Sequence, residues 1–292
     1  NVIELHNSYG LSLKTKVNIC ALILSAVVSK GEEKATHYKF TLSAPECFDI
    51  PAICGEAVRL AREKLGGGVP QTGACPVIFD PKAMSDLLGV FSDIFFASRA
   101  QKGLSKLAGK EGQVIAAPCV TIMDDPFRPG SIQAAFDGEG VATSRKCVVE
   151  NGTLNTLLYN LSTAKKAGRE STGNGARHNG IRYFNFYLAA GEATEEELLK
   201  KAEGGIYVTE IKGLHAGANA TTGDFSIESA GFMIKDGKLG RPVKAFTIAG
   251  NFFDLLRQID TLGNEVKFGL SGGPTMFGSP DVYITNMSVA GK

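Results

Sequence analysis

The chain has 292 residues, of which 43% are hydrophobic and 21% are charged, so it is long enough and apolar enough for one large or two ordinary domains. Its 31 basic and 30 acidic side chains leave a net charge of +1, which excludes an overall field that attracts nucleic acid or an anionic membrane. The longest apolar run, from Ile19 to Val28, is too short to span a bilayer, and no signal peptide precedes it. We therefore expect a cytoplasmic protein that binds neither nucleic acid nor membrane.

Six cysteines are spread along the chain in mostly apolar surroundings, without a Cys-x-x-Cys spacing. This distribution predicts reduced core thiols rather than a disulfide framework or a zinc ribbon. The first residue is Asn1 rather than Met, and it leads directly into a strand-like run, so we expect a fragment or a trimmed chain.

The first part of the chain alternates strand and helix patterns. Val2 to His6 and Leu11 to Val28 flank a turn and predict a hairpin, and Lys34 to Ser43 predicts a further strand. Asp49 is placed to cap a helix that continues to about Leu65 on an apolar stripe. Three consecutive glycines then end that helix.

The next segment predicts a buried strand from Cys75 to Phe79 and a helix that begins at Pro81 and continues to about Ser98. Beyond Gly112 the pattern changes to short strands separated by turn signals, with two further short helices. The predicted strands are 118–123, 132–136, 141–150, 153–160, 184–188, 205–211, 225–235, 240–248 and 282–289, and the helices are 194–202 and 252–258.

The order of these elements predicts an α+β fold dominated by antiparallel sheet. We expect residues 1–75 to form the end of an N-terminal α+β domain and residues 76–292 to form a β-rich C-terminal domain. A boundary near residue 110 is the alternative.

No complete catalytic motif is present. The four histidines are isolated, and none belongs to a His-Glu-x-x-His pattern. The paired carboxylates Asp124-Asp125 and Asp137-Gly-Glu139 flank turns, which favours turn and loop-anchoring roles over acid/base catalysis. Ser162-Thr-Ala-Lys165 matches the Ser-x-x-Lys pattern of serine acyl enzymes, but the other motifs of those enzymes are missing.

The stretch from Gly213 to Asp224 is unusual because three glycines stand among His215, Asn219 and Asp224. Glycine adopts positive φ and lets another backbone come close, so the loop indicates a surface for a peptide or another ligand. The alternative is a connecting loop in which Asn219 and Asp224 only form turns.

A succession of loop motifs runs through the second part of the chain: Asp124-Asp-Pro126, Phe136-Asp-Gly-Glu-Gly140, Ser171-Thr-Gly-Asn-Gly-Ala-Arg177, Asn185-Phe-Tyr-Leu188, the loop from His215 to Ser226, Thr247-Ile-Ala-Gly-Asn251 and Val289-Ala-Gly-Lys292. This succession resembles the TldD/PmbA family over residues 75–292, and residues 1–74 resemble the end of its N-terminal domain. The segment from Arg177 to Asn185 departs from the family pattern because it is short and lacks prolines.

The resemblance implies a two-subunit metalloprotease that degrades or trims unfolded peptides, from a family whose members have been described as modulators of DNA gyrase. One subunit, TldD, has a His-Glu-x-x-x-His helix and a late cysteine, and the other, TldE or PmbA, lacks both. Residues 87–94 and 268–274 contain none of these ligands here. The resemblance thus implies the PmbA type, with no catalytic or metal residue in this chain and zinc only in a TldD-type partner.

We accordingly predict a subunit that pairs with a TldD-type protein or with a second copy of itself and encloses an unfolded peptide at the interface. The predicted contacts with peptide or partner are His215, Asn219, Asp224, Phe225 and Ser226, beside a sheet edge formed by the strand 225–234. Two alternatives remain: a non-proteolytic regulator associated with DNA gyrase, and an autonomous serine hydrolase that uses Ser162 and Lys165.

Overall fold

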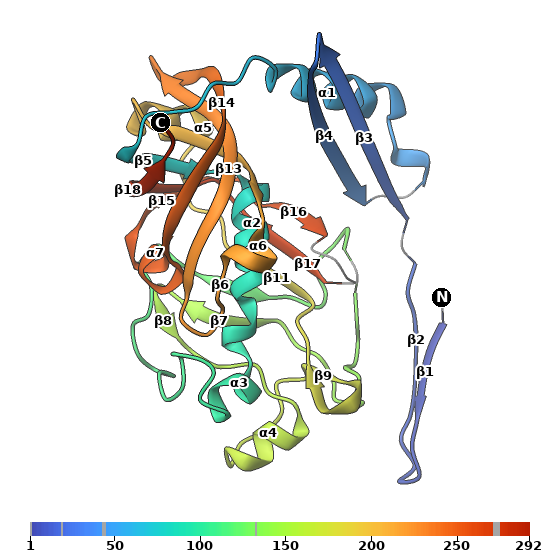
Figure 1. The fold of residues 1–292 in the computed structure, drawn as a ribbon. Helices are drawn as coiled ribbons and strands as arrows, with labels where there is room; N and C mark the ends of the chain where they lie inside the picture. Colours follow the sequence, from blue (N-terminus) through green and yellow to red (C-terminus); the bar gives the residue numbers. More distant parts are fainter. Residues whose placement is uncertain (1, 19, 43–44, 132, 271–274) are drawn as a thin grey trace.

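The computed structural model describes residues 2–18, 20–42, 45–131, 133–270 and 275–292. It has an α+β fold in which two mixed but mainly antiparallel six-stranded sheets lie on either side of a buried helix (Figure 1). The predicted fold class is confirmed.

The first sheet curves until it meets itself. Its strand order is β14-β13-β12-β5-β18-β15, and β14 also pairs with β18, which closes a ring. Only the β5–β12 pair is parallel. The strands are β5 (Gly73–Phe79), β12 (Ile206–Lys212), β13 (Asp224–Lys235), β14 (Lys238–Asn251), β15 (Ile259–Leu262) and β18 (Val282–Ala290).

The second sheet is built from shorter strands in the order β16-β17-β11-β6-β7-β8. β11 and β17 are parallel, and the other neighbours are antiparallel. The strands are β6 (Ile122–Asp124), β7 (Lys146–Glu150), β8 (Thr153–Leu154), β11 (Asn185–Leu188), β16 (Lys267–Leu270) and β17 (Met276–Ser279).

Helix α2 (Pro81–Phe91) contacts β12 of the first sheet and β17 of the second, which places it at the centre of the main core. Its N-terminus has the expected signals: Asp80 accepts a hydrogen bond from the amide of Ala83, and Pro81 occupies the first turn. Met84, Leu87, Leu88 and Phe91 are fully buried.

The predicted continuation of this helix to Ser98 is wrong. After Phe91 the chain forms a short 3₁₀ helix, η2 (Ser92–Phe95), and then α3 (Ala97–Gln101). Phe96 is extended between them, because the backbone of residues 95–97 pairs with Leu158 through the bonds Leu158 N to Phe95 O and Ala97 N to Leu158 O. Tertiary pairing overrides the helical periodicity here.

Short helices lie around the two sheets. They are α4 (Leu161–Lys166), α5 (Glu195–Lys201), α6 (Leu214–Gly217) and α7 (Phe252–Gln258). α5 and α7 confirm the two predicted short helices, whereas α4 was not predicted. A short hairpin of β9 (Gly175–Ala176) and β10 (Gly180–Ile181) encloses a 3₁₀ turn, η3 (Arg177–Asn179).

The N-terminal segment forms two separate hairpins. β1 (Val2–His6) pairs with β2 (Ser12–Lys16), and β3 (Ala21–Lys30) pairs with β4 (Glu33–Leu42), against which α1 (Ile50–Glu63) packs after a single turn, η1 (Pro45–Cys47). The predicted single strand 11–28 is therefore wrong, because its two halves pair with different partners. Asp49 caps α1 as predicted.

Two contacts connect the β3–β4 hairpin and α1 to the first sheet. Lys64, at the end of α1, forms an ion pair with Glu210 of β12 at 3.2 Å. Glu33 of β4 accepts a hydrogen bond from the amide of Gly66 and pairs with Lys244 of β14. Figure 1 shows both hairpins along one side of the sheets.

Three further expectations need correction. The predicted strand 132–136 is not a strand where it is described: residue 132 lies outside the described residues, and Phe136 forms only a bridge to Ala142. β15, β16 and β17 were not predicted. All six cysteines are free, as expected, but none is fully buried: Cys47 and Cys119 are exposed, and the other four are half-buried, with Cys75 packed against the main core. Among the described residues, no helix is both long and apolar enough to cross a bilayer.

Candidate functional site

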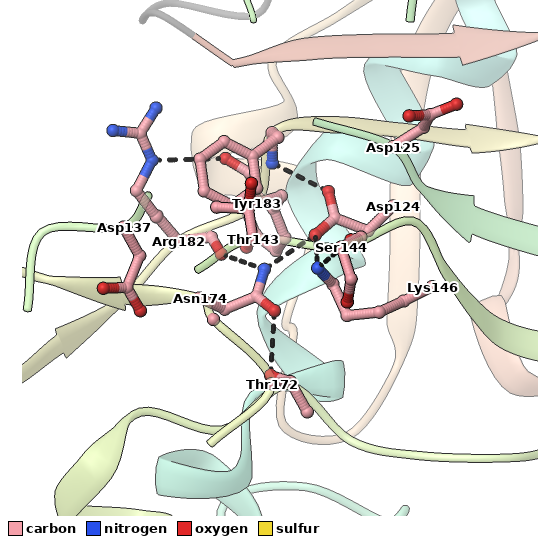
Figure 2. A network of polar contacts seen from close by, with 12 residues as sticks. Asp124, Asp125, Asp137, Thr143, Ser144, Lys146, Thr172, Asn174, Arg182 and Tyr183 are labelled. Carbon is pink, nitrogen blue, oxygen red and sulfur yellow. Dashed lines mark hydrogen bonds and ion pairs between the residues drawn. The ribbon is translucent and has the colours of Figure 1, made fainter. Parts of the chain in front are cut away.

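Several of the loop motifs, including those with Asp124, Asp137 and Asn174, meet around one buried carboxylate, Asp124, at the end of β6 (Figure 2). Asp124 has no exposed surface. Its Oδ1 accepts a hydrogen bond from the amide of Phe184 at 2.7 Å, and its Oδ2 accepts one from the side chain of Asn174 at 2.7 Å. The ammonium of Lys146 on β7 lies 3.6 Å from the same Oδ2.

Asn174 connects this carboxylate to two other segments. Its amide nitrogen donates a second hydrogen bond to the carbonyl of Arg182 at 2.8 Å, and its amide oxygen accepts one from the hydroxyl of Thr172 at 2.8 Å. Lys146 also donates to the carbonyl of Ser144 at 2.5 Å. The carboxylate of Asp124 thus accepts hydrogen bonds from residues 50 and 60 positions away in the sequence.

Burial disfavours the charged forms of both Asp124 and Lys146, which shifts their pKa values in opposite directions. It raises the pKa of Asp124 and lowers the pKa of Lys146, while the attraction between the two groups opposes both shifts. Removing either partner leaves the other charge buried and uncompensated.

The second carboxylate pair anchors loops in the same region. Asp137 is buried and accepts hydrogen bonds from the amides of Gly175, Glu139 and Val141. Glu139 accepts one from the amide of Leu161, at the start of α4. These bonds, together with those of Asp124, confirm the predicted loop-anchoring roles of both carboxylate pairs. Because Asp124 is sealed from solvent, no substrate reaches it in this conformation.

The loop from Gly213 to Asp224 has a different character, because many of its hydrogen bonds join residues that are close in sequence. The side chain of Asn219 accepts from the amides of Thr221 and Thr222, and its carbonyl accepts from the amide of Gly223. Asp224 accepts a hydrogen bond from the side chain of Asn251 at 2.8 Å, and this bond, together with the hydroxyl of Thr222, lowers the pKa of Asp224. The turn-forming roles of Asn219 and Asp224 are therefore present.

The glycines of this loop allow close approach, but to the chain's own residues. A methyl group at Gly217 would lie 2.3 Å from the carbonyl oxygen of Ser226 on β13. At Gly223, where φ is +86°, a methyl group would lie 2.5 Å from the ring of Phe253. Glycine is thus needed at both positions to fold the loop onto its own sheet.

Four of the five predicted contact residues, His215, Asn219, Asp224 and Ser226, are exposed on this loop and at the start of β13. Phe225 differs from the expectation: it is 4% exposed, and its ring centroid lies 6.1 Å from that of Phe91 on α2. Its side chain supports the strand from within the core and is not available to a ligand.

The expected sheet edge at 225–234 is also wrong. β13 pairs with β14 over residues 224–235 and with β12 over residues 228–233, and Phe225 bridges to Ala218. With both sides of the strand occupied, an incoming peptide cannot add to it as a new strand.

The Ser162 and Lys165 pair gains no support as a catalytic pair. Both residues lie on α4, and Ser162 lines a cleft of about 540 Å³, with Lys102 and Lys166 at its wall. Lys165 does not line this cleft, and no hydrogen bond joins it to Ser162 among the described residues. A nucleophile and its base need that contact.

The residues at the position of the family's metal helix do not fit zinc. Leu87, Leu88 and Phe91 are packed in the core, and the ring of Phe91 stacks on Phe252 with centroids 4.6 Å apart. Catalytic zinc needs about three His, Cys or carboxylate ligands, and the residue types on this face offer none. Within the described parts of the chain, no group of three such residues could hold a metal. The late segment is described only up to residue 270 and from 275 onward.

Sequence reasoning missed Asn251, which holds the loop through Asp224 and the carbonyl of Thr222. Its signal was an Asn between a strand and a helix, since its side chain also caps α7. It missed Lys146 and Asn174 as well. A lysine in an ordinary strand pattern carries no sequence signal for burial.

Comparison with known proteins agrees with these motifs. Residues 72–291 match the family model of the PmbA/TldA metallopeptidase C-terminal domain. The chain is 33% identical to the metalloprotease PmbA of Escherichia coli O157:H7, over 77% of this chain and 48% of that protein.

Two crystal structures are similar to this chain. A candidate modulator of a DNA gyrase from Thermotoga maritima is 36% identical with a TM-score of 0.91, covering 98% of this chain and 66% of that one. TldE from Thermococcus kodakarensis is 27% identical with a TM-score of 0.88, covering 99% and 66%. The chain thus spans 48% to 66% of the length of these relatives.

The matched domain is the C-terminal domain of a metallopeptidase family. The chain belongs to the PmbA/TldD family.

Proposed function

We propose that this chain is a PmbA/TldE-type subunit, which holds no metal itself and completes the peptide chamber of a two-subunit metalloprotease. The observation that carries this proposal is the packing of α2. Where the family's metal helix would present ligands, Leu87, Leu88 and Phe91 are fully buried in the core. A helix face used in this way stabilises the fold and cannot also face a bound metal and a water.

The position of the exposed loop supports the second half of the proposal. Phe91 of α2 packs beneath Phe225, which begins the strand that follows the loop. The loop therefore lies directly over the segment that corresponds to the metal helix. His215, Asn219, Asp224 and Ser226 are exposed there and are the side chains that we assign to contact with peptide or with the partner subunit.

The partner is a TldD-type subunit, or a second copy of this chain, and the substrate is an unfolded peptide. An isolated loop on a closed sheet encloses nothing, so a second surface is needed to exclude water and confine a peptide. In the heterodimer the partner provides the zinc and the chemistry, and this chain positions the peptide.

Reconstitution tests the proposal. The purified chain is expected to contain no stoichiometric zinc and to cleave no peptide, whereas a mixture with a zinc-loaded TldD-type subunit cleaves an unfolded peptide faster than that subunit alone. The His215→Ala, Asn219→Ala double variant should fold and lose most of this stimulation. One zinc per purified chain would contradict the first half, and full stimulation by the double variant would contradict the role of the loop.

A further inference from the structure

A small cleft lies beside the loop, and two of its lining residues contact the loop. It has a volume of about 170 Å³, and Asn251 and Phe253 form part of its wall. Asn251 donates to Asp224 and to the carbonyl of Thr222, and Phe253 packs under Gly223. The cleft and the loop therefore form one continuous surface.

The lining of the cleft combines an apolar base with a positive rim. Leu107, Ile115 and Phe253 are buried and form the base. The ionisable lining residues are Lys106, Lys110, Arg257 and Asp254. Three cations against one carboxylate leave the rim with an excess of positive charge, although the chain as a whole carries only +1.

The partners of these cations show which of them is free for a ligand. Arg257 lies 3.5 Å from Asp254, and Lys110 donates to the side chain of Gln113 at 3.1 Å. The ammonium of Lys106 lies 5.2 Å from the ring centroid of Phe253 and, among the described residues, makes neither a hydrogen bond nor an ion pair. It is near enough to Asp224 to contribute to the lowered pKa of that carboxyl, after the hydrogen bonds from Asn251 and Thr222.

We infer that this cleft binds a carboxylate of the peptide, with Lys106 as its principal contact and the apolar base holding the methylene groups of an acidic side chain. A volume of about 170 Å³ suits one side chain or chain end and is below the range of about 300–1,000 Å³ of drug-sized sites. This inference rests on the proposed function, since it takes the ligand to be the peptide that reaches the neighbouring loop. It adds a preference for acidic peptides.

The carboxylate has two sources, an acidic side chain or the peptide's own C-terminus, and four fluorescent peptides separate them. They share one unfolded sequence and carry either Glu or Gln at a central position, each with a free or an amidated C-terminus. Binding to the purified 292-residue chain is measured by fluorescence anisotropy at low ionic strength. We expect a carboxylate-bearing peptide to bind about five- to tenfold more tightly than the neutral peptide, and the preference to weaken as salt is added.

Variants that remove a positive charge from the cleft test which residues cause the preference for a carboxylate. Lys106→Gln, alone or with Arg257→Gln, should remove the preference by lowering the affinity for the carboxylate-bearing peptides about five- to tenfold, toward that for the neutral peptide. Lys238→Gln is the matched control, because it removes an exposed lysine from the turn between β13 and β14. Equal binding of all four peptides, no binding of any of them, or an unchanged preference in Lys106→Gln would overturn the inference.

These outcomes are distinguishable from failure of the proposed function. If the chain stimulates cleavage by a TldD-type subunit but binds acidic and neutral peptides equally, only the cleft assignment is wrong. If the acidic preference depends on Lys106 but no stimulation occurs, the cleft binds carboxylates and the proposed subunit role fails.

Discussion

The segments around Asp124 and the loop from Gly213 to Asp224 have similar compositions, rich in Gly, Asn and Asp, but opposite structures. Asp124 and Asn174 have no exposed surface, and they bond to segments distant in sequence. In the loop, Asn219 and Asp224 are exposed, and the side chain of Asn219 bonds to residues within three positions of itself.

Burial therefore separates two roles that the sequence presents alike. The buried side chains use their polar atoms to hold the fold, and a buried polar group that loses its partner is costly. The loop side chains keep donor and acceptor positions open to solvent, where a peptide or a partner can use them. Stability should depend on the first region and function on the second.

The largest expected effect comes from Asp124→Ala. The substitution leaves the ammonium of Lys146, which is 8% exposed, without its counter-ion and removes the acceptor for the side chain of Asn174 and the amide of Phe184. We expect the free energy of unfolding to fall by about 3–5 kcal/mol, as measured by urea denaturation.

Asp125→Ala is the matched control for this prediction. Within the described parts of the chain, the neighbouring carboxylate accepts a hydrogen bond from the amide of Phe127 alone, and it lies 3.6 Å from the exposed guanidinium of Arg145. Its loss should cost about 1 kcal/mol or less. If both variants lose the same stability, the buried network is not the anchor that we describe.

The two asparagines allow a second comparison. Asn174→Ala removes one buried side chain that bonds three different segments, and we expect a loss of about 2–3 kcal/mol. Asn219→Ala removes the two side-chain hydrogen bonds of an exposed turn and should lower the free energy of unfolding by about 1 kcal/mol at most. Thermal and urea unfolding of the two variants measure the difference, and the reverse order of stability would be inconsistent with our assignment of the two regions.

The local elements of the fold were predictable because their signals are local. Asp49 before α1, Asp80 with Pro81 before α2 and Thr194 before α5 are caps that need no tertiary context. The Asn151-Gly152 turn between β7 and β8 belongs to the same class, with Asn151 at φ 47°. The loop from Gly213 to Asp224 was predicted to lie at the surface because glycine, His and Asp rarely combine in a plain connection, and His215, Asn219 and Asp224 are exposed there.

Long-range features were not predictable from these signals. No pattern within β13 shows that β14 covers one side of it and β12 the other, so the strand was expected to be an edge. Phe225 was assigned to the surface because the alternation of side chains along a strand defines two faces but does not tell which face is buried. The interruption after Phe91 depends on pairing with Leu158, more than 60 residues away.

The third prediction compares two glycines of the loop. Both have positive φ, +72° at Gly213 and +86° at Gly223, but a methyl group meets nothing within 4 Å at Gly213 and lies 2.5 Å from the ring of Phe253 at Gly223. We expect Gly213→Ala to cost about 1 kcal/mol, the price of positive φ alone, and Gly223→Ala about 1–2 kcal/mol. Because Phe253 also lines the cleft, Gly223→Ala should also lower the affinity for peptide, which fluorescence anisotropy measures. Equal stability and equal peptide affinity of the two variants would show that the contact with Phe253 is unimportant.

The smallest effect is a local dependence on pH. The side chain of Asn251 and the hydroxyl of Thr222 hold the pKa of Asp224 below its ordinary value of 3.8. A carboxyl whose pKa is lowered in the folded state stabilises that state above its unfolded pKa, and this contribution is lost as pH falls through the folded pKa. The loop should therefore keep its bonds at pH 5 and release the carboxylate of Asp224 only below about pH 3.8. NMR titration of the amides of residues 219–224 and of the side chain of Asn251 would follow this release. In Asp224→Asn the low-pH step should disappear from these signals while the hydrogen-bonded turn at Asn219 persists. A midpoint above 3.8, or an unchanged step in that variant, would show that another group controls the loop.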